Sequence, residues 1–190
     1  MSEISVEDLI GIAKEIKDKE LRQKVIEILK HPSLSNPKFR QKPAKLSECP
    51  ASLNWHHVYE GGLVRHTYAV TKMCIAIAQN FKDIYGYEMD MDSLIAASLV
   101  HDIGKLWSMR KDKTWVANEI SLDHTVLGTA ELYARGFPEK VIHIVASHFG
   151  EQGPTPPQTP EAILFHHIDL LNATLNTTKS TDDIIRLILG

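Results

Sequence analysis

The chain has 190 residues, a length that suits one compact domain with a substantial hydrophobic core. Its net charge of −3 argues against a nucleic-acid binder that relies on overall basicity, and its two cysteines indicate neither a zinc ribbon nor a disulfide framework. No stretch approaches the about 18 apolar residues of a membrane span. We therefore expect a single domain over residues 1–190 that is soluble and cytoplasmic, contacts no membrane and could form a homo-oligomer.

Residues 1–30 predict an N-terminal helical segment. Ser5 followed by Asp8 matches a capping box, and apolar residues then recur at helical spacing in two blocks. The pattern fits one interrupted helix or two short ones. It ends at His31, because the residue before Pro32 is disfavoured in helical geometry.

Residues 31–54 contain four prolines and little periodicity, so they predict a long, proline-rich basic loop. Its cations outnumber its single acid, Glu48, and they are Lys38, Arg40, Lys42 and Lys45. They form either an ordinary solvated face or a phosphate-binding lid over a substrate. In the second case Lys38 and Arg40 are candidate substrate-binding residues.

A helix is predicted from Leu63 to about Phe81. Its apolar stripe includes one histidine, and the stripe residues are Leu63, His66, Val70, Met73, Ile77 and Phe81. His66 therefore faces the core, where it is either a hydrogen-bonded core residue or a metal ligand.

Polar residues around the start of this helix are candidates for substrate contact. His56, His57 and Glu60 either orient the substrate and the metal ligands or cap the beginning of the helix. Arg65 either binds a phosphate group or faces solvent.

The run from residue 93 to residue 100 predicts a buried helix with Asp92 as its N-cap and Gly104 as its stop. At its end it delivers His101 and Asp102 side by side. A buried carboxylate needs a countercharge, which a divalent cation supplies. Lys105 follows three residues after Asp102. It either lies in a loop above the metal site or is an ordinary surface lysine. Residues 106–117 predict a short β-hairpin or an irregular excursion.

The C-terminal half predicts further helices, each bearing a polar residue of interest. His124 opens the helix that runs to about residue 135, and His148 shares a face with the apolar residues of the next one. A third helix begins after Thr159 and carries Asp169 among apolar neighbours, where a carboxylate needs neutralisation by a buried cation. Residues 180–190 predict a last amphipathic helix.

The inward-facing imidazoles and carboxylates together predict a metal centre within residues 55–175. The candidate ligands are His66, His101, Asp102, His124, His148 and Asp169. Nitrogen and oxygen ligands of this kind suit Mn, Fe, Co, Ni or Zn rather than Ca or Mg. With Asp102 as a bridge, the set could hold one or two divalent transition-metal ions.

These residues resemble a known family. His66, then His101-Asp102, then Asp169 match the order and context of the HD superfamily of metal-dependent phosphohydrolases. The resemblance implies a single all-α helical bundle in which these four residues bind one metal, with His124 and His148 as the extra ligands of two-metal members. The run from His56 to His66 is similar to the HD domain of bacterial 3′-to-5′ exoribonucleases, which favours a nucleotide-type phosphate ester as substrate.

The expected function is hydrolysis of a phosphate ester, monoester or diester, by a hydroxide that forms from metal-bound water. Asp102 and Lys105 are the candidate catalytic residues, the lysine because it could stabilise charge on the phosphate or assist the leaving oxygen. Nucleic acid is expected only as a substrate. Two alternatives stay open at this stage: a di-iron oxygenase on the same scaffold, and a non-catalytic, metal-stabilised module that senses a ligand.

Overall fold

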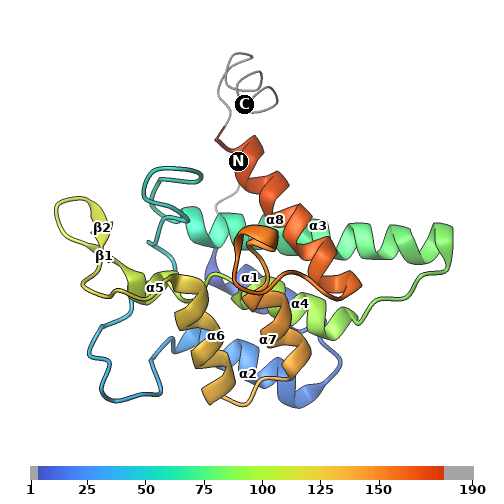
Figure 1. Ribbon diagram of the computed structural model, residues 1–190, viewed down its shortest axis with the longest axis horizontal. Helices are drawn as coiled ribbons and strands as arrows, with labels where there is room; N and C mark the ends of the chain where they lie inside the picture. The colour runs from blue at the N-terminus through green and yellow to red at the C-terminus, as the bar shows by residue number, and fades with distance from the viewer. Residues whose placement is uncertain (1–3, 178–190) are drawn as a thin grey trace.

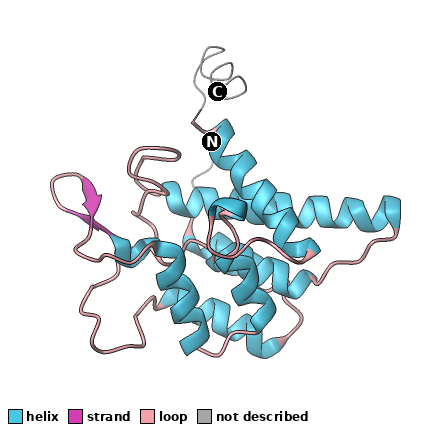
Figure 2. Ribbon diagram, viewed as in Figure 1, coloured by secondary structure: helices cyan, strands magenta, loops and turns pink. Residues whose placement is uncertain are grey.

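The computed structural model describes residues 4–177. Within them the chain is helical apart from one small sheet, so the predicted all-α fold with a short hairpin is confirmed (Figure 2). The elements are α1 Val6–Ala13, α2 Lys19–Lys30, α3 Gly62–Tyr85, α4 Met91–Val100, α5 Lys105–Ser108, β1 Met109–Lys111, β2 Trp115–Ala117, α6 His124–Ala134, α7 Glu139–Ala146, the 3-10 turn η1 Gly150–Gln152, and α8 Pro160–Leu175. The predicted helix over residues 180–190 lies outside the described residues.

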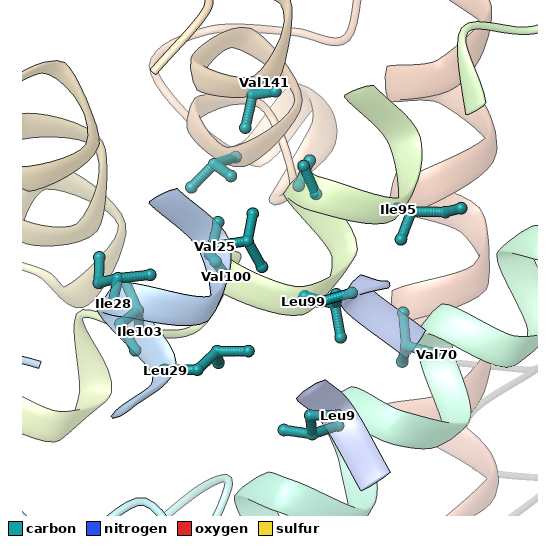
Figure 3. Close-up of a cluster of buried hydrophobic side chains, with 14 of the residues drawn as sticks. Leu9, Val25, Ile28, Leu29, Val70, Ile95, Leu99, Val100, Ile103 and Val141 are labelled. Carbon is teal, nitrogen blue, oxygen red and sulfur yellow. The ribbon is translucent and has the colours of Figure 1, made fainter. Parts of the chain in front are cut away.

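Helix α4 is the centre of the bundle. Its residues from Ser93 to Val100 are all buried, and it packs against α1, α2, α3, α7 and α8 (Figure 1). Figure 3 shows how Leu99 and Val100 of α4 lie among side chains from α1, α2 and α3. A helix that is apolar on every side needs such all-round burial. The residues that follow α4 are therefore held inside the molecule.

Local sequence signals account for several helix ends. Ser5 and Asp8 form the predicted capping box of α1, and two separate helices, α1 and α2, replace the alternative of one interrupted helix. Asp123 caps α6 and Thr159 caps α8, each with its side chain accepting a backbone N–H of the first turn.

Two predictions about the ends of α4 are wrong. The N-cap is Asp90, which accepts a hydrogen bond from the backbone of Ser93. The carboxylate of Asp92 instead accepts the backbone N–H groups of Lys17 and Asp18 at 2.9 and 2.8 Å, which ties the α1–α2 link to α4. At the other end α4 stops at Val100, before Gly104. Gly104 has an ordinary right-handed conformation, and its backbone packs closely against the start of α6.

The predicted stripe of α3 is correct in its first half. Leu63, His66 and Val70 are buried, but Met73 and Ile77 are half-buried and Phe81 is 40% exposed. The helix continues to Tyr85, past the edge of the bundle, and residues 81–85 are exposed (Figure 1). The long 31–54 segment is a loop without helix or strand, as expected. Within the described part of the chain, every helix is too short or too polar to cross a bilayer.

Candidate metal centre

All six predicted ligands meet at one place in the bundle. His66 comes from the first turns of α3, and His101 and Asp102 come from the turn after α4. The other three come from the start of α6, the turn after α7 and the middle of α8, and they are His124, His148 and Asp169. His148 thus lies just past the end of the helix on which the sequence placed it. His66, His101, Asp102 and His148 are each 3% exposed or less. Elements far apart in the sequence thus direct these side chains to a common interior point.

Three of these residues form a first ligand group. Nε2 of His66 lies 2.9 Å from Oδ1 of Asp169, and Nε2 of His101 lies 3.6 Å from the same oxygen. The two Nε2 atoms are 3.3 Å apart. The three atoms are therefore close enough to bind one ion together.

Asp102, His124 and His148 form a second group with the same compactness. The two carboxylate oxygens of Asp102 face different groups. Oδ2 lies 3.2 Å from Nε2 of His101 and 3.7 Å from Nε2 of His66, whereas Oδ1 lies 3.4 Å from Nε2 of His124. The two oxygens of Asp102 thus face both ligand groups at once.

Hydrogen bonds at Nδ1 determine which imidazole nitrogen carries the proton. Nδ1 of His101 donates to the carbonyl oxygen of Ser98 at 2.9 Å, and Nδ1 of His148 donates to that of Val145 at 2.7 Å. Because a carbonyl oxygen only accepts, Nδ1 bears the hydrogen and Nε2 bears the lone pair. Both Nε2 atoms are thus in the state that a metal ion requires.

The other two imidazoles have the same arrangement. Nδ1 of His66 lies 2.9 Å from Oδ1 of Asn172, and Nδ1 of His124 lies 3.2 Å from a carboxylate oxygen of Asp123. Ligating histidines in proteins commonly use such a partner to fix the ring orientation and the tautomer.

The centre therefore gathers acceptors that face one another. Among the described residues, Oδ1 of Asp102, Oδ1 of Asp169 and Nε2 of His124 are buried without a hydrogen-bond partner. Buried carboxylates and imidazole lone pairs at 3 to 4 Å repel one another unless a cation lies between them. A donor set of imidazole nitrogen and carboxylate oxygen without thiolate fits divalent transition metals.

The electrostatics of the centre support this interpretation. Burial raises the pKa of Asp102, but the positive charges of His101 and Lys105 outweigh burial and hold the pKa well below its ordinary value. Burial lowers the pKa of His148 to about 4, so this ring is neutral near pH 7. Burial alone would also lower the pKa of His101, yet the carboxylate of Asp102 raises it. The carboxylate of Asp102 thus favours positive charge at His101, the same sign of charge that a metal ion would bring.

The sequence matches the family described as HD domain over residues 63–174, a range that contains all six predicted ligands. The chain belongs to the HD-domain family. It is 44% identical over 174 residues to the dihydroneopterin 2′,3′-cyclic phosphate phosphodiesterase of Methanocaldococcus jannaschii, covering 90% of this chain and 70% of that protein. The predicted HD-type phosphohydrolase family is confirmed, and divalent-metal binding agrees with it.

More distant relatives are 3′-5′ exoribonucleases named YhaM. The chain is 29% identical to the Oceanobacillus iheyensis protein, and the match covers 93% of this chain and 60% of that protein. It is also 29% identical to the Bacillus subtilis protein, and that match covers 72% of this chain and 46% of that protein. This HD domain thus spans less than two thirds of either exoribonuclease. No solved structure gives a significant match to the chain.

Lys105 and His56 also lie at the metal centre of this HD domain. A cavity of about 280 Å³ opens onto Asp102 and Asp169 and is lined by Lys105 and His56 as well. The Nζ of Lys105 lies 2.6 Å from Oδ2 of Asp102. His57 is buried behind His56, with their Nδ1 atoms 3.0 Å apart, and both rings pack against His66.

The remaining predicted substrate residues do not line this cavity. Arg65 is half-buried over the ring of Tyr59, and Glu60 pairs with Lys111 at 3.0 Å on the surface. Lys38 and Arg40 are exposed on the 31–54 loop. Positive charge in the sequence did not indicate how far from the centre each side chain would lie.

Sequence reasoning did not identify the groups that hydrogen-bond to Nδ1 of the candidate ligands in this HD-domain site. Asn172 had one detectable signal, since it lies three residues after Asp169 on the same face of α8. The backbone carbonyl groups that accept hydrogen bonds from His101 and His148 had no signal in the sequence, because every residue type has a carbonyl oxygen. Trp55 and Phe149, which also line the cavity, were not singled out either.

Proposed function

We propose that this HD domain hydrolyses a phosphodiester of nucleotide type, with cyclic phosphodiesters as its principal substrates. The bridging position of Asp102 between two groups of ligands is the observation that carries the proposal. Two ions about 3.5 to 4 Å apart are typical of sites that hydrolyse phosphate esters. The names of the relatives support the substrate class, since one acts on a 2′,3′-cyclic phosphate and others on RNA.

We infer that the site holds two divalent ions drawn from Mn, Fe, Co, Ni and Zn. His66, His101 and Asp169 would hold one, His124 and His148 would hold the other, and Asp102 would contact both. Bound there, the ions would supply Lewis acidity that activates water and neutralises charge on the phosphate.

The protein's own groups position and balance this chemistry. Lys105 brings a cation into the cavity, where it stabilises negative charge as it develops on the phosphate oxygens or the leaving oxygen. Phe165 is fully buried and packs against His101, with ring centres 5.0 Å apart. It thereby keeps water from the back of the site. The hydrogen bonds at Nδ1 keep every Nε2 aimed at the centre.

The test combines a metal panel with a substrate panel. Purified protein is loaded with Mn, Fe, Co, Ni, Zn or Mg, and each form is assayed on a 2′,3′-cyclic nucleotide, a linear dinucleotide and a nucleoside monophosphate. We expect the highest kcat/KM on the cyclic diester with a transition metal. Release of phosphate from the monoester alone would overturn the proposal. Oxygen consumption by the iron-loaded protein without hydrolysis would instead favour the di-iron oxygenase.

Asp102→Asn provides the decisive variant, because it keeps the side-chain volume and removes the bridging charge. We expect it to lose bound metal and at least about 100-fold in kcat/KM while the helical circular dichroism stays parental. Asp112→Asn, in the exposed turn of the hairpin, is the matched control. Parental activity in Asp102→Asn would contradict the assignment of the site.

A further inference from the structure

A second, larger cavity adjoins the metal centre. Its volume is about 650 Å³, within the range of about 300 to 1,000 Å³ that is usual for small-molecule sites. It shares Trp55, His148, Phe149 and Asp169 with the cavity over the metal ligands. A molecule whose reacting group lies at the metal centre can therefore extend directly into this second space, which we name the aromatic cavity.

Two large rings stand at the junction of the two cavities. Trp55 is 45% exposed and Phe149 is 37% exposed, although both lie beside a buried centre. Exposed aromatic surface of this size costs free energy that a ligand would recover by covering it. Trp55 and Phe149 lie next to the candidate metal ligands, whereas the other exposed aromatic residues of the described chain lie elsewhere on the outer surface.

Both rings are held in position. The backbone N–H of Trp55 donates to the hydroxyl of Ser52 at 3.0 Å, and the indole meets His56 edge-on with ring centres 4.9 Å apart. Phe149 packs on His148 with ring centres 4.5 Å apart and planes 31° apart. Such fixed rings lose little conformational freedom when a ligand stacks on them.

Gly150 sets the wall of the aromatic cavity on the side of α8. Its φ of 62° is left-handed, and a Cβ there would collide with the ring of His166. Nδ1 of that ring donates to the carbonyl oxygen of His148 at 2.7 Å. Glycine therefore lets the turn that bears Phe149 lie directly against α8, which brings the phenyl ring to the cavity.

The rest of the lining has two kinds of residue. Apolar surface comes from the prolines after η1 and from Ile163 and Leu170 of α8, while Glu151, Gln152 and His167 add groups that can form hydrogen bonds. Flat apolar walls with a few polar groups at the edge suit a planar ring that carries ring nitrogens and exocyclic donors.

We propose that the aromatic cavity binds the heteroaromatic ring of the substrate, a nucleobase or a similar fused nitrogen ring, against Trp55 and Phe149. The phosphodiester of the same molecule then lies at the metal centre, and stacking determines which phosphodiesters are good substrates. This inference rests on the proposed phosphodiesterase function and adds the specificity-determining residues to it.

The experiment compares two substrates that differ only in the ring. Adenosine 2′,3′-cyclic phosphate carries a base, and methyl riboside 2′,3′-cyclic phosphate carries the same reacting group without one. We expect kcat/KM to be at least about 10-fold higher for the adenosine compound, since one stacked base changes affinity by about 5- to 150-fold. Trp55→Ala should raise KM for the adenosine compound by about 10-fold with little change in kcat, and should change the KM of the base-free compound much less.

Two further variants separate stacking from structural effects. Trp55→Phe keeps a ring and should restore the parental KM. Tyr133→Ala removes an aromatic side chain that is 78% exposed on α6, outside both cavities, and should change nothing. Binding is read independently by fluorescence: adenosine monophosphate should quench the tryptophan emission of the metal-loaded parent but not of Trp55→Phe, and ribose 5-phosphate should quench neither.

Equal kcat/KM on the two substrates, or an unchanged KM in Trp55→Ala, would overturn this inference while leaving the proposed phosphodiesterase intact. If neither compound is hydrolysed, the proposed function fails. The fluorescence titration then decides the ring site by itself, since quenching by adenosine monophosphate that disappears in Trp55→Phe supports it and the absence of quenching in the parent refutes it.

Discussion

Oδ2 of Asp102 lies 2.6 Å from Nζ of Lys105, and the two side chains are only 3% and 12% exposed. The same carboxylate faces ligand histidines on both sides. Lys105 is therefore the nearest protein cation to the bridging carboxylate, and it lies on the open side of the site. A metal ion bound to this carboxylate would add its charge to that of the lysine.

Replacing Lys105 should separate metal binding from turnover. In Lys105→Met the metal ions still balance Asp102, so we expect parental metal content with kcat lower by about 100- to 1,000-fold, the usual effect of losing one electrostatic stabiliser. Lys140→Met, which breaks an exposed ion pair with Asp90, is the control and should keep full activity. A parental kcat in Lys105→Met would show that the lysine has no part in the reaction.

Asn172 should control metal affinity through His66. Asn172→Leu removes the acceptor of the His66 Nδ1 proton, so the other tautomer becomes accessible and Nε2 no longer always presents a lone pair. We expect divalent-metal affinity, measured by competition with a chelator, to fall by about 10- to 100-fold. Asn172→Asp retains an acceptor and should stay near the parental affinity, as should Asn80→Leu on the exposed side of α3. Equal affinities in all three variants would refute this role.

Gly104 should be needed for the position of His124. A Cβ at Gly104 would collide with the carbonyl oxygen of His124, whereas a Cβ at Gly128 would lie 3.5 Å from its nearest neighbour, an ordinary contact. We expect Gly104→Ala to lower the free energy of unfolding by about 1 to 3 kcal/mol and to weaken metal binding, because the start of α6 has to move. Gly128→Ala should be tolerated to within about 1 kcal/mol, since alanine favours a helix. Urea titration measures the stability of the two variants, and metal analysis measures their bound metal. Equal losses of stability and metal in Gly104→Ala and Gly128→Ala would argue against a specific contact between Gly104 and His124.

Acid should destabilise the metal-free protein through its buried neutral histidines. Burial lowers the pKa of His56 to about 3 and the pKa values of His57 and His148 to about 4. The unfolded chain binds these protons near pH 6.5, so the stabilisation is complete above pH 6.5 and is lost as the pH falls toward 4. His101 and His124 act in the opposite direction, because their pKa values are raised and they favour the folded state at low pH.

A single variant isolates this effect. His56→Gln removes one proton that only the unfolded chain binds around pH 5, so the slope of unfolding free energy against pH should fall there by about 1.4 kcal/mol per pH unit. At pH 8 and above the slopes of the variant and the parent should coincide. Denaturant titrations of chelator-treated protein provide the measurement, and identical slopes at pH 5 would contradict the buried neutral state.

Much of the fold and the ligand set followed from local patterns. The capping box at Ser5, the cap at Thr159 and the inward stripe that contains His66 depend on residues within one or two turns of a helix. Periodicity also placed Asp169 among apolar neighbours. These features required no knowledge of distant segments.

For other features the local sequence favoured two residues equally or gave no signal. Asp90 and Asp92 are both acids at the start of α4, and only the packing of the α1–α2 link engages Asp92 and leaves Asp90 as the cap. The basic loop and Arg65 carry suitable charge, yet the chain path places them away from the cavity. Trp55 and Phe149 are far apart in the sequence, and only the tertiary structure brings them to line the same cavities.

The sequence by itself determined which helices form and which polar side chains they turn inward, because capping and periodicity act over a few residues. The tertiary structure alone decided that Asp102 faces two ligand groups at once, that carbonyl and amide oxygens fix each imidazole, and that an aromatic cavity opens beside them. Those relationships depend on how helices pack across the whole chain, and packing depends on the shapes of all their surfaces together.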